Sequence, residues 1–141
     1  LLLMRAKINR SKIFVILSPV GPYFETGFAP INLYCEDKQV RAAPFGTGCY
    51  KIGGNYGPTI PVSTMAEKLG CSQVLWLYKG LVTEIGSSNI FMVWKNKEGE
   101  TELITHPADD LILHGVTRDS VIVRVFCNSS EYCQRQWNQS K

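Results

Sequence analysis

The sequence contains no apolar run long enough to cross a membrane. Its longest apolar candidate, Ile13–Leu17, stops before Pro19, whereas a spanning helix needs about 18 apolar residues or more. Positive charge is also sparse, because the formal net charge is only +3 and the basic residues form no stripe interleaved with aromatic residues. These absences argue against a membrane span and against nucleic acid as a partner.

The sequence also lacks the common nucleotide-binding and serine-hydrolase motifs. The glycines before Lys51 have neither the spacing of a P-loop nor the G-x-G-x-x-G order. No G-x-S-x-G elbow occurs, and His106 and His114 lie in plain loop contexts. The five cysteines include no C-x-x-C pair and no metal-like spacing with either histidine. We therefore expect no metal site, and we interpret the cysteines as reduced thiols of an intracellular protein.

What the sequence does contain is enough apolar residues for one core. The chain has 141 residues, of which 45% are hydrophobic and 11% aromatic, which is typical of a globular domain. Residues 1–12 carry four basic residues and no acidic one, a little like an organellar transit sequence. The first residue is not Met, which suggests a clipped or partial chain, so a cytoplasmic and a mitochondrial location both stay open.

Alternation of apolar segments with turn residues predicts a mixed α+β fold. We expect a buried strand at Lys12–Ser18, a connector at Pro19–Pro30 and a short strand at Ile31–Cys35. A helix is predicted over Thr59–Leu69, because Pro61 suits a first turn and Gly70 a C-terminal cap.

The second half predicts a strand, an antiparallel meander and a helix start. Gln73–Tyr78 is a strongly apolar strand candidate, and Leu81–Ile85, Asn89–Lys95 and Thr101–Thr105 are expected to pair as one meander. A helix could begin at Gly115–Ser120, with Thr117 as its cap, although the β-branched run Val121–Phe126 favours a strand. The polar tail after it is expected to fray.

Three glycine-containing segments carry the candidate chemistry. Lys51 lies between two glycine clusters in Phe45–Thr59, Glu84 precedes Gly86, and a helix opening at Gly115–Thr117 would present free N–H groups to an anion. Each segment alone also fits a solvated surface loop or a surface carboxylate. A reactive lysine, a carboxylate and an anion cradle together suit pyridoxal phosphate.

The chain resembles branched-chain amino acid aminotransferases, which form part of the class IV pyridoxal-phosphate-dependent family. The resemblance rests on segments that keep the family's order and spacing: Val15–Phe24, Arg41–Pro44, Gly46–Gly48, Lys51–Gly57, Gln73–Tyr78, Thr83–Gly86, Asn89–Phe91, and Leu113 with Gly115–Arg118. It implies the α+β fold of class IV aminotransferases, also called the D-amino-acid-aminotransferase-like fold, with mostly the core of the larger domain present.

The same resemblance implies the residues that hold pyridoxal 5'-phosphate. Lys51 matches the lysine that forms the Schiff base with the cofactor, and Tyr56 matches the tyrosine that hydrogen-bonds its phenolic oxygen. Glu84 matches the carboxylate paired with the pyridine nitrogen, and Arg41 matches an arginine that lines the cofactor pocket. Lys51 is also the expected catalytic residue.

Further matches concern the phosphate and the substrate. Val116 and Thr117 match residues whose backbone amides hold the phosphate, and Ser87 stands where the family often has threonine near phosphate and substrate. Tyr23 and Phe24 fall in the interdomain loop that helps to close the substrate pocket.

The chain also departs from the family pattern. Phe45 replaces a frequent glycine, and His114 replaces the usual proline, for which we expect looser order rather than loss of the site. The resemblance divides the chain into the end of a small domain (1–18), a connector (19–30), a partial large domain (31–120) and a divergent tail (121–141). The remainder of the small domain and a later phosphate loop have no counterpart here.

The resemblance implies transfer of the amino group of leucine, isoleucine or valine to 2-oxoglutarate, giving branched 2-oxo acids and glutamate. Amino acids and 2-oxo acids are therefore the expected small-molecule partners, and complete subunits are expected to form a homodimer. Two alternatives stay open. The chain could be an inactive partial large domain that retains only the cofactor scaffold, or a class IV enzyme for D-amino acids or aminodeoxychorismate.

Overall fold

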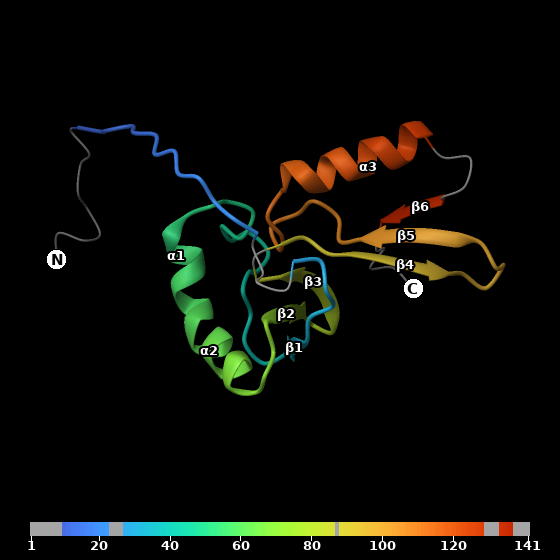
Figure 1. Ribbon diagram of the computed structural model, residues 1–141, viewed down its shortest axis with the longest axis horizontal. Coiled ribbons are helices and arrows are strands. Elements are labelled where there is room, and N and C mark those ends of the chain that lie inside the picture. Colours follow the sequence, from blue (N-terminus) through green and yellow to red (C-terminus); the bar gives the residue numbers. More distant parts are fainter. Residues whose placement is uncertain (1–9, 23–26, 87, 129–132, 137–141) are drawn as a thin grey trace. The chain divides into compact units, whose positions relative to one another are not determined.

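A computed structural model of the chain describes residues 10–22, 27–86, 88–128 and 133–136 (Figure 1). The chain divides into two compact units, Leu1–Pro30 and Ile31–Lys141. No helix in the part of the chain that the structure describes is long and apolar enough to cross a bilayer.

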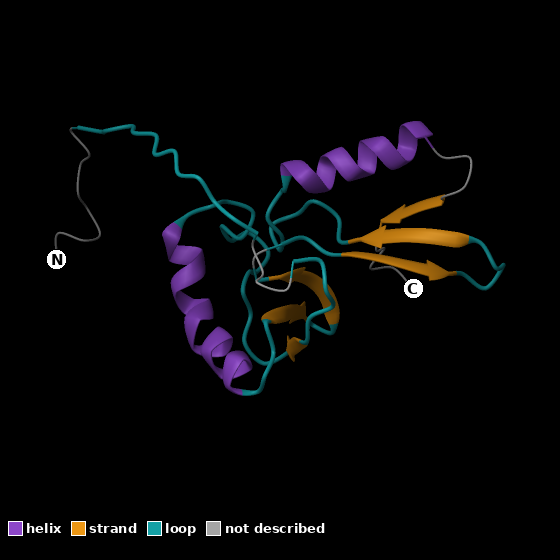
Figure 2. Ribbon diagram, viewed as in Figure 1, coloured by secondary structure: helices purple, strands orange, loops and turns teal. Residues whose placement is uncertain are grey.

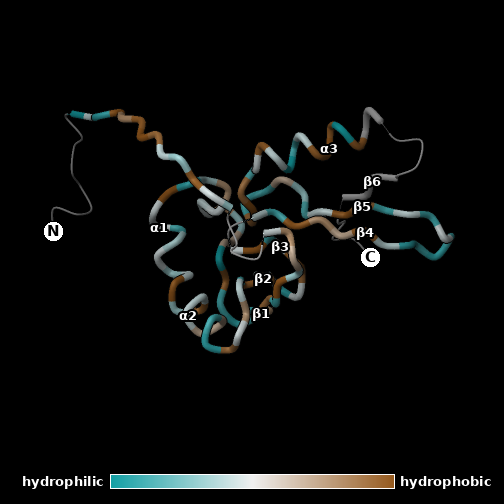
Figure 3. The backbone as a smooth tube through the Cα atoms, viewed as in Figure 1, coloured by the Kyte–Doolittle hydropathy of each residue, from teal (hydrophilic) through white to brown (hydrophobic). Residues whose placement is uncertain are grey.

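The described part of the first unit contains no helix or strand, so the strand predicted at Lys12–Ser18 is wrong. Ile13 and Leu17 are 94% and 91% exposed, and this apolar stretch is visible as a brown run in Figure 3. A strand needs a partner for its backbone groups. The two described sheets do not include residues 12–18, which explains why β-branched composition alone does not produce a strand here.

The second unit begins with a three-stranded sheet that places Glu84 at the end of a strand. The strands are β1 (Leu33–Glu36), β2 (Gln73–Tyr78) and β3 (Leu81–Ile85), in the order β1-β2-β3. β1 runs parallel to β2, and β3 runs antiparallel to it. Lys79 and Gly80, between β2 and β3, have φ of 51° and 79°, as the mirror-image turns of tight hairpins require.

Helix α2 (Ile60–Lys68), which follows α1 (Gly53–Tyr56) and the 3-10 helix η2 (Gly57–Thr59), packs against β2 and forms with it the core of this unit. Val62 and Ala66 of α2 pack with Val74 and Trp76 of β2, and all four side chains are 1% exposed. The helix predicted at Thr59–Leu69 is confirmed, and it ends as expected, with Pro61 in its first turn and Gly70 at φ 77° after its end.

A second sheet contains β4 (Phe91–Lys95), β5 (Thr101–Thr105) and β6 (Cys133–Gln136), in that order (Figure 2). β5 is antiparallel to β4 and parallel to β6. The predicted meander is therefore wrong in its pairing, because β3 belongs to the first sheet and the second contains β4 and β5. The tight turn before β3 pairs that strand with β2, and beyond β3 an isolated bridge joins Ile85 to Ser88.

Helix α3 (Val116–Asn128) begins where the sequence predicted a helix but continues through the β-branched run. The expectation of a strand at Val121–Phe126 is wrong. Val121, Ile122 and Val125 are half-buried while Val123 is 61% exposed, a spacing that fits one face of a helix. β-branched residues cost only about 0.5 kcal/mol each in a helix, so this burial outweighs their preference. Thr117 is the second helical residue rather than the cap.

Candidate functional site

A cavity of about 540 Å³ in the second unit brings separate parts of the sequence together. Its lining includes six residues that the sequence predicted for the site: Arg41, Lys51, Tyr56, Glu84, Val116 and Thr117. They come from the loop after β1, from the lysine loop with α1, from β3 and from the start of α3. The other three predicted residues, Tyr23, Phe24 and Ser87, lie outside the described residues.

The lysine loop is held in a compact form by glycine and turn hydrogen bonds. Lys51 is exposed, and its Nζ lies 5.9 Å from the centroid of the Tyr56 ring, within the range of a cation–π contact. Gly48 is required by packing, because a Cβ there would collide with Ala42 and come within 2.6 Å of the Asp110 carbonyl oxygen. The close approach of two backbone segments therefore fixes where the loop enters the cavity.

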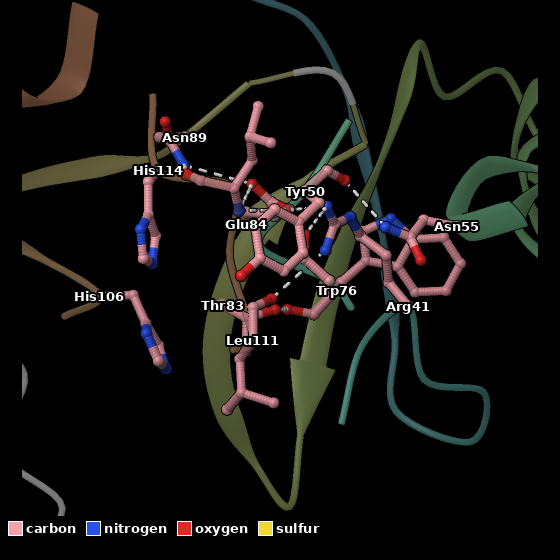
Figure 4. Close-up of polar contacts among 12 residues, drawn as sticks. Arg41, Tyr50, Asn55, Trp76, Thr83, Glu84, Asn89, His106, Leu111 and His114 are labelled. Atoms are coloured by element: carbon pink, nitrogen blue, oxygen red, sulfur yellow. Dashed lines mark hydrogen bonds and ion pairs between the residues drawn. The ribbon is translucent and has the colours of Figure 1, made fainter. Parts of the chain in front are cut away.

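Glu84 is buried where β3 ends, and four polar contacts orient its carboxylate. Arg41 Nη2 lies 2.5 Å from Oε1, the Leu113 N–H donates to both oxygens at 3.2 Å, and Asn89 Nδ2 donates to Oε2 at 3.2 Å (Figure 4). Burial raises the pKa of Glu84 from 4.5 to about 7, against the opposing effects of Arg41 first and then of the Leu113 N–H. The cavity thus contains a carboxyl group that can hold or release a proton near neutral pH.

Arg41 connects this carboxylate to the lysine loop. Its side chain is 3% exposed, and its guanidinium donates to the Gly48 carbonyl at 3.0 Å and to the Leu111 carbonyl at 3.4 Å. A buried arginine needs such partners for its several N–H groups. Arg41 therefore acts as a cross-link that ties the loop before Lys51 to the end of β3.

The start of α3 forms the other end of the cavity. The Gly115 carbonyl accepts the first helical hydrogen bond, from the Asp119 N–H at 3.0 Å. The N–H groups of the following first turn have no carbonyl partner within the helix. A Cβ at Gly115 would collide with Asn89 Oδ1, so glycine permits the helix start to lie against the residue that also holds Glu84.

Arg118 and Asn89 are site residues to which the sequence interpretation assigned no role. Arg118 is 4% exposed and lines the cavity. Its Nη2 donates to the His106 carbonyl at 2.7 Å and its Nη1 to Asp119 Oδ1 at 2.9 Å, while its Nε has no hydrogen-bond partner. Both residues belonged to quoted motifs, and the available signal was a cationic or amide side chain beside the predicted anion cradle.

His114, which departs from the family pattern, does not occupy the cavity wall. Its side chain is exposed, and Nε2 lies 3.1 Å from the Asp109 carbonyl oxygen. α3 begins two residues later in spite of the missing proline. The described residues include no group of three or more His, Cys, Asp or Glu side chains that could hold a metal ion.

The family model of amino-transferase class IV matches residues 5–125. This match covers most of the chain, so the protein belongs to the class IV aminotransferase family. The observed mixed α+β arrangement is the class IV fold over part of its length.

Curated relatives and a solved structure agree with this family. The chain is 50% identical over 116 residues to the mitochondrial branched-chain-amino-acid aminotransferase of Schizosaccharomyces pombe, covering 81% of this chain and 27% of the relative. It is 49% identical over 119 residues to the cytosolic enzyme of that name from Mus musculus, covering 82% and 31%. The PLP-form of the branched-chain aminotransferase from Thermobaculum terrenum matches with a TM-score of 0.59 at 27% identity, covering 74% and 33%. The chain thus spans about a third or less of the length of these proteins.

Proposed function

We propose that this chain is the part of a branched-chain amino acid aminotransferase that holds pyridoxal 5'-phosphate, and that the complete protein transfers amino groups from leucine, isoleucine or valine to 2-oxoglutarate. The observation that supports this most strongly is the single cavity lined by Lys51, Tyr56, Glu84 and the start of α3. The relatives named above support the substrate class, since they are branched-chain-amino-acid aminotransferases. Their names, which include a mitochondrial and a cytosolic enzyme, also lead us to propose one of these two locations, and the family resemblance of the sequence leads us to propose a homodimer of complete subunits.

The residues present fit the cofactor in size and in chemistry. The cavity of about 540 Å³ lies in the usual range of small-molecule sites. At one end, the free N–H groups of α3 and the buried guanidinium of Arg118 suit a phosphate. The unpartnered Nε of Arg118 supports this, because a buried donor without a partner is costly and an anion would satisfy it.

The other end of the cavity suits a ring nitrogen. Glu84 has a pKa raised to about 7 by burial, and a cationic partner in the cavity would favour its charged form. Arg41, the Leu113 N–H and Asn89 hold the carboxylate in one orientation. Glu84 can therefore hold a proton between its oxygen and a ring nitrogen, while Val116 and Thr117 present backbone N–H groups at the opposite end.

Lys51 supplies the reactive amine of this proposal. When bound, the cofactor supplies an aldehyde for the amine and a ring that accepts the electrons left behind when a substrate loses its α-proton. Lys51 Nζ would accept that proton from the α-carbon of the amino acid and return it on the next step. Tyr56, next to the Lys51 ammonium, provides a phenol that can donate a hydrogen bond at the same end of the cavity.

The proposal is tested with the complete protein and with its Lys51→Ala variant. We expect amino transfer from L-leucine to 2-oxoglutarate in the complete protein and a loss of at least about a thousandfold in the variant, since the group that moves the proton is removed. D-alanine serves as the competing substrate. A preference for D-alanine over L-leucine, or an unchanged rate in Lys51→Ala, would contradict the proposal.

A second candidate function is supported by the exposure of the cavity wall. Lys51 is exposed and Val116 is 82% exposed, so the described residues alone do not exclude water around the amine, as transamination requires. The 141-residue chain by itself would then bind cofactor without turnover. Purified chain that transfers the amino group of L-leucine at a rate comparable with the complete protein would exclude this scaffold function.

A further inference from the structure

We infer that Asn55 is a positioning residue for Lys51, because its side-chain amide fastens the loop that precedes the lysine to helix α1. This inference rests on the proposed function, since the position of Lys51 matters only if its amine reacts. Asn55 is half-buried and lies in α1. It stands four residues after Lys51 and directly before Tyr56, so it links the two residues proposed to contact the cofactor.

Three hydrogen bonds carry the inference. Asn55 Nδ2 donates to the Thr47 carbonyl at 2.6 Å and to the Tyr50 carbonyl at 2.8 Å, and Thr47 Oγ1 donates to Asn55 Oδ1 at 2.7 Å. Figure 4 shows the Asn55 side chain with Tyr50 beside the Arg41 and Glu84 cluster. Both donors and the acceptor of the amide are therefore used within a single loop.

These partners define which way round the amide lies. If the side-chain nitrogen and oxygen were exchanged, the amide oxygen would face two carbonyl oxygens, which repel it. The amide nitrogen would face the Thr47 hydroxyl, which can accept from one of its two N–H groups, and the other N–H would have no acceptor. Asn55 is thus a specific choice at this position. An aspartate of nearly the same shape would place a carboxylate oxygen against the carbonyls of Thr47 and Tyr50 and would lose both donations.

The bonds matter for Lys51 because the other long-range contacts of this loop act at or before Gly48: Arg41 donates to the Gly48 carbonyl at 3.0 Å, and the Phe45 N–H donates to Asp110 Oδ2 at 2.8 Å. Within the loop, the Tyr50 N–H donates to the Thr47 carbonyl at 3.0 Å, and the N-cap of α1, Ile52, makes no side-chain capping bond. Phe45, at the start of the loop, and Lys51 are both exposed. Without Asn55, the backbone bond from Tyr50 to Thr47 would be the one described hydrogen bond that holds residues 49–51, so the Lys51 amine would be spread over more positions.

The first test is amide hydrogen exchange in the cofactor-free chain, which does not depend on the proposed function. In Asn55→Asp, the peptide that contains residues 46–51 is expected to exchange about tenfold faster, the effect of losing roughly one net hydrogen bond. Thr47→Val should show part of this effect and Thr47→Ser almost none, because serine retains the hydroxyl. Unchanged exchange in Asn55→Asp would overturn the inference.

The second test measures the reaction of Lys51 with pyridoxal phosphate itself, without substrate. The wild-type chain is titrated with pyridoxal phosphate, the adduct is fixed by borohydride, and the modified peptide is identified by mass. The concentration needed for half-modification of Lys51 is expected to rise about tenfold in Asn55→Asp, again the effect of roughly one hydrogen bond.

Asn96→Asp is the matched control for a purely structural effect. The Asn96 side-chain amide also holds a turn, because it donates to Glu100 and Glu102 in the β4–β5 hairpin, outside the lysine loop. The Asn96→Asp variant should have a lower free energy of unfolding and unchanged modification of Lys51. An equal loss of Lys51 modification in Asn55→Asp and Asn96→Asp would overturn the inference, as would equal modification of the wild type and Asn55→Asp.

If the wild-type chain forms no adduct at Lys51, the proposed function fails, and the exchange experiment alone decides the role of Asn55.

Discussion

Phe45 adopts a backbone conformation that its residue type does not favour. Its φ is 63°, a conformation that costs a residue with a Cβ roughly 1–2 kcal/mol relative to glycine, which agrees with the glycine that the resemblance leads us to expect here. The Phe45 N–H donates to Asp110 Oδ2 at 2.8 Å, so the backbone keeps this turn in spite of the side chain. The sequence identified the departure, but the backbone conformation behind it required the structure.

Glu84 gives a pH-dependent prediction. Its pKa in the folded chain is raised from 4.5 to about 7. Between these two pH values the folded chain therefore holds a proton on Glu84 that the unfolded chain has released. Its stabilising contribution is complete below pH 4.5 and is lost as pH rises through about 7, a loss on the order of 3 kcal/mol. Glu84→Gln should therefore flatten the decrease in unfolding free energy over this range.

This prediction is checked by urea unfolding of the cofactor-free chain at several pH values. Glu67→Gln, on the exposed side of α2, is the matched control and should keep the wild-type slope. A Glu84→Gln variant whose stability falls with pH as steeply as that of the wild type would contradict the raised pKa.

At the scale of elements, Gly115 is the point where α3 and the Glu84 cluster meet. A Cβ there would collide with Asn89 Oδ1, and Asn89 Nδ2 also donates to the Leu113 carbonyl at 2.8 Å. Gly115→Ala should displace Asn89 and lower the unfolding free energy by about 1–2 kcal/mol. Gly57→Ala is the control, because its φ is −51° and a Cβ there meets open space. Denaturant midpoints that shift equally in both variants would rule out this role for Gly115.

The elements themselves were predictable where local signals and burial agree. The predicted bounds of β2, β3 and β5 match the structure, because apolar residues, Lys79-Gly80 and the polar hairpin turn all indicate the same ends. The partner of β3 was not predictable, since pairing depends on which strand the turn returns to. Helix α3 was only partly predicted. The conformation of its β-branched segment depends on burial along one helix face, which is a tertiary effect that the local sequence does not show.

In the whole molecule, the sequence predicted which distant residues line the cavity better than it predicted how the strands pair. Arg41, Lys51, Glu84 and Thr117 are distant in the sequence, and they line one cavity. A resemblance of ordered motifs carries that information, because each motif keeps its own position relative to the others. It does not carry the contacts that orient the groups, such as those from Asn89 to Glu84 and from Arg41 to the Gly48 carbonyl, which became visible in the structure.

In the function proposed above, Lys51 is the amine that reacts with pyridoxal phosphate, in a cavity completed by Glu84 and the start of α3. The most direct measurement is peptide mapping after borohydride reduction of the chain in the presence of pyridoxal phosphate, with inorganic phosphate added as a competitor. We expect one dominant modified peptide, containing Lys51, reduced modification when phosphate competes for the α3 end, and no such adduct in Lys51→Ala. Modification spread evenly over surface lysines, or a persistent dominant adduct in Lys51→Ala, would contradict the account.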